Sequence, residues 1–71
     1  MIILNDLARI RNEMGLSTRQ LEKLSGVDHS TITKIENGDE IPGQLVILRL
    51  CRGLGRETGE VFYLNWRKLN I

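Results

Sequence analysis

This 71-residue chain has little cysteine, proline, histidine or aromatic content, and the shortages of cysteine and histidine each exclude a kind of site. The single cysteine, Cys51, excludes an internal disulfide and a zinc site built on paired thiolates. With only one histidine as well, we expect no metal centre and no cofactor, and we interpret Cys51 as a small core residue. No stretch approaches the roughly 18 apolar residues that span a bilayer, and the N-terminus lacks the basic start of a signal peptide. We therefore expect a cytoplasmic protein without membrane contact.

Neither the net charge nor the reactive side chains indicate a function. Ten basic and nine acidic residues give a net charge of +1, which by itself favours neither a nucleic-acid partner nor an acidic one. The sequence contains no paired-carboxylate, Ser-His or Cys-His arrangement and no phosphate-binding loop, so we do not expect an enzyme. A partner must therefore be argued from how the side chains are distributed along the chain.

The residues that are present predict one small helical domain with an aliphatic core. At 41% hydrophobic and 27% charged the chain has enough apolar side chains to fold, but 71 residues leave no room for a second domain. Apolar residues recur at helical spacing in five segments. The predicted ranges are Ile3 to Met14, Thr18 to Leu24, His29 to Glu36, Gln44 to Leu54 and Glu57 to Leu64.

Local capping signals define the second and third of these helices. Ser17 and Gln20 have the spacing of a capping box, in which each side chain satisfies a free amide at the helix start. Asp28 is a favourable N-cap residue for the next helix, and Val27 and Ile32 have the spacing of a hydrophobic staple. We therefore expect two short helices that follow each other closely.

Two short helices joined by a turn of about four residues containing Gly26 are typical of a helix-turn-helix. In that motif the second helix lies in the major groove of DNA, with its N-terminal residues at the base edges. The outward side chains of the third helix are polar and short, which suits hydrogen bonding better than packing. The candidates for base contact are His29, Ser30, Thr33 and Lys34.

Several motifs together resemble the Cro and lambda-repressor-like family, the Xre-type regulators. They are Leu16-Ser17-x-x-x-Leu21, Leu24-Ser25-Gly26-Val27, Ser30-Thr31-Ile32-x-Lys34-Ile35-Glu36-Asn37-Gly38 and Leu50-x-x-x-Leu54-Gly55. The resemblance extends from about Leu7 to Phe62. It implies an all-α, five-helix DNA-binding domain, usually a homodimer that acts as a transcriptional repressor or controller on double-stranded DNA. Residues 63–71 would form a C-terminal tail and a candidate dimer contact.

Roles are also expected for residues outside the base-reading set, some from the resemblance and some from their places at the helix ends. The residues expected at the phosphate backbone are Thr18, Arg19, Asn37 and Arg11. In the phage-repressor branch an Arg on the first helix pairs with a Glu at the end of the recognition helix, and Arg11 and Glu36 occupy those positions. For Arg19 the alternative is a solvated face shared with Glu22 and Lys23. After Gly38, where several relatives are basic, this chain has two acidic residues, Asp39 and Glu40, which would weaken DNA binding.

Apolar residues near the C-terminus leave two functions open. The residues interpreted as an exposed dimer surface are Leu45, Val46, Phe62, Tyr63 and Trp66, although the aromatic residues could instead cap the small core. The leading hypothesis is a sequence-specific regulator that binds a two-fold symmetric operator as a homodimer. The alternative is a protein-interaction module, or an antitoxin-like protein, that holds a protein partner through the same surface.

Overall fold

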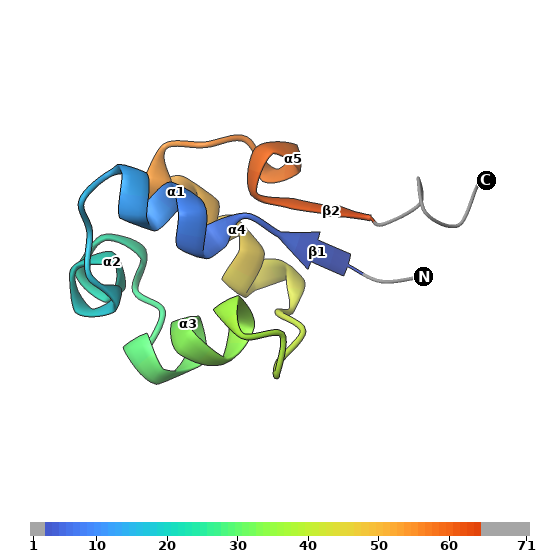
Figure 1. The fold of residues 1–71 in the computed structure, drawn as a ribbon, viewed down its shortest axis with the longest axis horizontal. Helices are drawn as coiled ribbons and strands as arrows, with labels where there is room; N and C mark the ends of the chain where they lie inside the picture. Colours follow the sequence, from blue (N-terminus) through green and yellow to red (C-terminus); the bar gives the residue numbers. More distant parts are fainter. Residues whose placement is uncertain (1–2, 65–71) are drawn as a thin grey trace.

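The computed structural model describes residues 3–64, which form five helices and a two-stranded ribbon (Figure 1). The ribbon joins the two ends of the described chain, because the first strand pairs antiparallel with the last. In chain order the elements are β1 Ile3–Asn5, α1 Leu7–Glu13, α2 Thr18–Ser25, α3 His29–Glu36, α4 Gln44–Leu54, α5 Thr58–Val61 and β2 Phe62–Leu64.

The core cluster is apolar, and every helix contributes to it. The aliphatic side chains on the inward faces of α1, α2, α3 and α4 are almost completely buried, as their helical spacing predicted. Phe62 at the start of β2 is the one aromatic residue in the core of the described chain. The core residues are Leu7, Ile10, Leu21, Val27, Ile32, Ile35, Leu50, Cys51, Leu54, Val61 and Phe62. Burial also raises the pKa of the Cys51 thiol, which fits a packing role.

The predicted first helix was wrong at its start. Residues Ile3–Asn5 form strand β1 rather than helix, and α1 begins only at Leu7. The reason is local and tertiary together: Asn5 accepts a hydrogen bond from the Leu7 amide with its Oδ1 and donates through Nδ2 to the carbonyl of Ile35. An Asn side chain that bonds the backbone in this way competes with helix formation.

The predicted fifth helix was wrong at its end. It stops at Val61, and Phe62–Leu64 then pair with β1 in the register Asn5 to Phe62 and Ile3 to Leu64. The Val61 carbonyl accepts from the Asp6 amide at 2.8 Å, so the ribbon continues into the start of α1. No helix within residues 3–64 is long and apolar enough to cross a membrane.

Ser25 at the end of α2 holds the turn that follows by two buried hydrogen bonds. Its hydroxyl donates to the Leu21 carbonyl at 2.7 Å and accepts from the Val27 amide at 3.1 Å. Both partners are shielded from water, because Leu21 and Val27 are buried. The side chain thus replaces the backbone bonds that are lost where α2 ends.

Replacing Ser25 with alanine should therefore lower the free energy of unfolding by about 1–2 kcal/mol, since the buried Val27 amide would lose its partner. Urea denaturation measures the change. Lys23→Ala on the exposed side of the same helix is the control and should stay within about 0.5 kcal/mol of the wild type. Equal effects of the two substitutions would contradict the role assigned to the hydroxyl.

Candidate nucleic-acid interface

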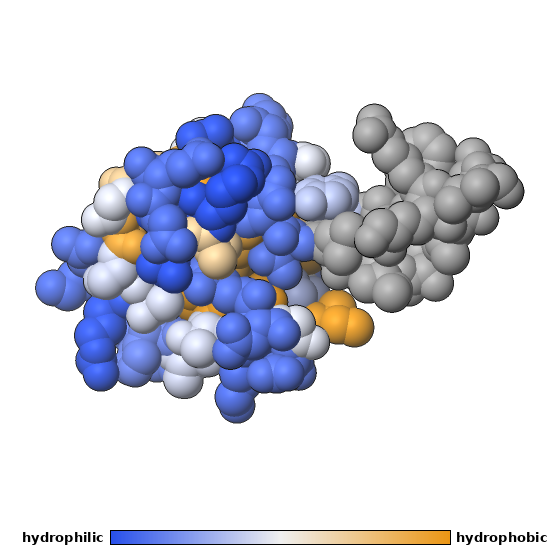
Figure 2. Space-filling view, in the orientation of Figure 1, coloured by the Kyte–Doolittle hydropathy of each residue, from blue (hydrophilic) through white to orange (hydrophobic). Residues whose placement is uncertain are grey.

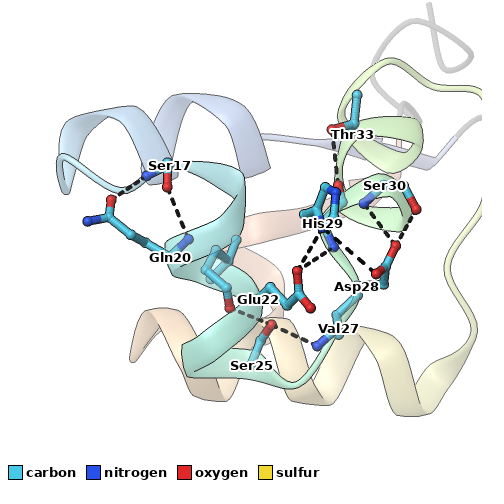
Figure 3. A network of polar contacts seen from close by, with 10 residues as sticks. Ser17, Gln20, Glu22, Ser25, Val27, Asp28, His29, Ser30 and Thr33 are labelled. Atoms are coloured by element: carbon cyan, nitrogen blue, oxygen red, sulfur yellow. Dashed lines mark hydrogen bonds and ion pairs between the residues drawn. The ribbon is translucent and has the colours of Figure 1, made fainter.

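Helix α2 begins and ends with the local signals that its sequence predicted. The Ser17 hydroxyl accepts from the Gln20 amide at 3.0 Å, and the Gln20 side chain accepts from the Ser17 amide at 2.7 Å (Figure 3). At the other end Gly26 has φ 77°, a left-handed conformation that a residue without a β-carbon adopts without strain. The predicted capping box is confirmed, and it fixes where the first helix of the motif starts.

Helix α3 begins at an Asp28 cap. One carboxylate oxygen of Asp28 accepts from the backbone amide of Ser30 at 3.0 Å and also from the Ser30 hydroxyl. The hydroxyl and amide of Ser30 both hold the pKa of the Asp28 carboxyl below its usual value. The ionised carboxylate therefore contributes to the order of the first turn of α3, where Ser30 is a predicted base contact.

This cap makes the stability of α3 sensitive to acid. Because the pKa of Asp28 is lowered in the folded state, its contribution is present above the ordinary value of 3.8 and is lost as the pH falls through the lower folded value. We expect Asp28→Asn, which keeps a capping side chain but does not titrate, to lose less thermal stability than the wild type between about pH 5 and pH 2. Thermal unfolding followed by circular dichroism tests this, and parallel pH profiles would contradict it.

His29, the first residue of α3, is tied back to α2 by a single side chain. Glu22 accepts from the His29 amide at 3.2 Å, and the same carboxylate oxygen lies 2.8 Å from the ring atom Nδ1. Both side chains are about a third exposed. The contact therefore joins α2 to the first residue of α3 at the solvent-facing edge of the motif (Figure 3).

The remaining predicted base contacts lie on the exposed side of α3. Ser30, Thr33 and Lys34 are all exposed, and the Thr33 hydroxyl donates to the His29 carbonyl at 3.0 Å. Residues three and four positions apart share one helix face, so these side chains and His29 form one contiguous surface. This surface carries little charge, because Lys34 is the one Lys or Arg among the four predicted base contacts.

The predicted pair of Arg11 and Glu36 is confirmed and largely buried. Two guanidinium nitrogens of Arg11 donate to the two carboxylate oxygens of Glu36 at 2.7 and 3.0 Å, and the third donates to the Leu16 carbonyl at 2.8 Å. The side chains are only 14% and 9% exposed, and the Glu36 carboxylate raises the pKa of the guanidinium. The pair connects α1, the loop after it and the end of α3, so it positions the recognition helix.

Comparison with known proteins identifies the family to which these helices belong. The HTH_3 helix-turn-helix family model matches residues 7–61, which is most of the chain and includes all five helices. The chain belongs to this family. It is thus an Xre/Cro-like DNA-binding transcriptional regulator with the all-α, five-helix, lambda-repressor-like fold, and not an enzyme.

Individual relatives of this helix-turn-helix regulator come from several organisms. It is 32% identical over 60 residues to the uncharacterized HTH-type transcriptional regulator YgzD of Bacillus subtilis, covering 84% of this chain and 91% of that one. A second HTH-type regulator, from Haemophilus influenzae, is 37% identical over 54 residues, covering 76% of this chain and 55% of that one. Among solved structures, the restriction-modification controller protein C.AhdI from Aeromonas hydrophila is 35% identical with a TM-score of 0.73, covering 76% and 82% of the two chains.

Three of the four predicted phosphate contacts of the regulator lie at the two ends of the helix-turn-helix. Thr18 is half-buried and Arg19 exposed at the start of α2, while Asn37 is exposed at the end of α3. These three side chains are therefore available at the ends of the motif. Arg11 differs from them, because all three of its guanidinium nitrogens already donate within the domain.

Only some residues of the predicted dimer surface are exposed. Phe62 was wrong as an exposed residue: it is 7% exposed and packs in the core, because it follows α5 directly and faces inward from the ribbon. Val46 is partly buried against the same core, whereas Leu45 and Tyr63 are exposed. Trp66 lies outside the described residues. On the face that Figure 2 shows, hydrophobic colour is confined to small separate areas among polar side chains.

Glu22 is the residue at this interface that sequence reasoning missed. It was interpreted as part of a solvated face with Arg19 and Lys23, yet it makes two hydrogen bonds to His29. The ligand-capable atoms of Glu22, Asp28 and His29 also lie within 4.8 Å of one another, a grouping that the spacing did not suggest. Glu22 and His29 are seven residues apart across a turn, so no helical or strand period relates them.

Proposed function

We propose that this regulator binds a two-fold symmetric operator as a homodimer, with α3 in the major groove, and acts as a repressor or controller in the cytoplasm. The observation that carries the proposal is the exposed polar face of α3, whose first turn is fixed by the Asp28 cap and the Glu22 contact. Short hydroxyl side chains bond several bases, and a threonine methyl also contacts thymine. The similarity to a restriction-modification controller protein supports the assignment as a controller.

The first test separates base-reading residues from phosphate contacts. In a random-site selection at low salt the wild type should enrich one symmetric sequence. Ser30→Ala and Thr33→Ala should each reduce discrimination at one or two base pairs by about tenfold, because they remove contacts to base edges. Arg19→Ala should instead weaken binding to all duplexes equally. A wild-type protein without preference for any duplex would refute the proposal.

The acidic loop after α3 gives a second prediction. Asp39 and Glu40 are exposed and carry negative charge close to the end of the recognition helix. The double change Asp39→Asn with Glu40→Gln should raise DNA affinity by about three- to tenfold at low salt, with a smaller gain at high salt, because repulsion from phosphates is screened. Fluorescence anisotropy with a labelled operator measures both affinities. A gain that does not change with salt would contradict an electrostatic cause.

The homodimer is the second part of the proposal. With few cations at the interface, one domain would bind weakly, so two linked recognition helices about 34 Å apart would supply the affinity. Exposed apolar side chains support a contact through α4 and the C-terminal part, with Leu45 59% exposed and Leu48 52% exposed. The residues assigned to this surface are Leu45, Val46, Tyr63 and Trp66.

Sedimentation velocity tests the assigned surface. Leu45→Glu should give a monomer that retains weak half-site binding and loses the avidity of the full operator, because a charge disfavours apolar contact. Met14→Glu is the matched control, since Met14 is 42% exposed at the far end of α1 and outside the assigned surface. A monomeric wild type that forms a stable complex with another protein through Leu45 would favour the interaction-module alternative.

A further inference from the structure

The contact between Glu22 and His29 determines which ring nitrogen of His29 carries a proton. A carboxylate oxygen only accepts hydrogen bonds, and Glu22 Oε1 lies 2.8 Å from Nδ1, so Nδ1 is the donor. The second carboxylate facing the ring is that of Asp28, whose Oδ1 lies 3.8 Å from the same nitrogen. Both negative groups are thus on the Nδ1 side of the ring, as Figure 3 shows. In a neutral imidazole the other nitrogen, Nε2, is then an acceptor.

The Nε2 atom remains free for a partner outside the domain. Within the described residues, Nε2 makes no hydrogen bond, while Nδ1 makes the Glu22 contact. No buried side-chain nitrogen or oxygen atom in that part of the chain lacks a partner. Nε2 is therefore at the surface, on the residue that opens α3.

Glu22 also limits the movement of the ring. The same carboxylate oxygen holds the His29 amide and the His29 side chain, so backbone and ring are fixed together. A side chain held by hydrogen bonds within the free protein loses little conformational entropy on binding. The ring is thus oriented before any partner arrives.

We propose that Glu22 is a positioning residue that determines specificity, because it makes the neutral ring of His29 an acceptor through Nε2. In the major groove an acceptor is matched by the exocyclic amine of adenine or cytosine, whereas guanine presents only acceptors there. His29 would therefore contact the exocyclic amine of an adenine or a cytosine at one position in each half-site. This inference rests on the proposed function, since it places α3 in the major groove.

The single histidine of the chain allows a direct test of the protonation pattern. Nitrogen-15 NMR of the free protein, in alkaline buffer with a chelator, reports which ring nitrogen bears hydrogen. We expect the Nδ1–H form in the wild type and in Glu22→Gln, which keeps an acceptor oxygen, and its loss in Glu22→Ala. A wild-type ring protonated at Nε2 would overturn the proposal.

Random-site selection with the same proteins tests the reading role. His29→Ala should lose discrimination at one base pair of each half-site by about tenfold, Glu22→Ala should lose it at the same base pair, and Glu22→Gln should retain it. Thermal unfolding checks that Glu22→Ala remains folded. A His29→Ala or a Glu22→Ala protein with wild-type selectivity would overturn the proposal. Absence of any duplex preference, with Nδ1–H observed, would instead refute the proposed function and leave the Glu22–His29 contact standing.

Discussion

Replacing Arg11 with methionine should lower the free energy of unfolding by about 3–5 kcal/mol, because it leaves a mostly buried carboxylate without its partner. The Glu36 side chain is 9% exposed, and both of its oxygens accept from Arg11. The Leu16 carbonyl would lose its donor as well. A domain of this size holds only about 4–10 kcal/mol in total, so the variant would lose a large share of its stability.

Two further variants distinguish the loss of the buried ion pair from the loss of an exposed one. Arg9 on the same helix pairs with Asp6 and Glu13 but is 55% exposed, so Arg9→Met should leave the urea midpoint almost unchanged. Replacing both partners, as Arg11→Met with Glu36→Leu, should recover most of the lost stability, because no unpaired charge remains. Urea denaturation of the three variants measures this. An Arg11→Met protein as stable as Arg9→Met would contradict the assigned role.

Replacing Gly53 with valine should destabilise the domain by about 3 kcal/mol, because α2 and α4 touch at this residue. A β-carbon at Gly53 would lie 3.0 Å from the β-carbon of Ser25 and 3.1 Å from its backbone nitrogen and α-carbon. These atoms cannot move aside like the end of a flexible side chain, since Ser25 is held by its own buried hydrogen bonds. The two helices would have to separate, which exposes core surface.

Gly59 provides the matched control for this substitution. It lies within helix α5, and no atom lies within 4 Å of the position a β-carbon would occupy. Gly59→Val should therefore change the free energy of unfolding by less than about 0.5 kcal/mol. Thermal and urea unfolding of both variants measure the difference. Similar losses at the two glycines would show that valine in a helix, and not the contact with α2, is responsible.

The helices that carry the interface could be predicted from sequence because their signals are local. The predicted range His29 to Glu36 agrees with α3, Gln44 to Leu54 agrees with α4, and α2 differs by one residue at its end. Caps and apolar spacing act within three or four residues, and both were present at α2 and α3. The face of α3 proposed to meet DNA followed directly from those helix boundaries.

The ribbon could not be predicted in this way. Ile3 lies at helical spacing with Leu7 and Ile10, so the pattern indicated helix where the structure has strand β1. The partner strand begins at Phe62, at the opposite end of the chain, and no local period relates the two. The same pairing places Phe62 in the core, which removed it from the predicted dimer surface.

The sequence by itself thus determined the family, the helix-turn-helix and the side chains that the recognition helix presents, because these depend on neighbouring residues and on motifs. Only the tertiary structure shows which residues of other elements contact those side chains. It placed Glu22 against His29 and Gly53 against Ser25, contacts that form only when helices pack. The physical reason is that hydrogen bonds and close approaches between elements depend on distances in space, which spacing along a chain does not encode.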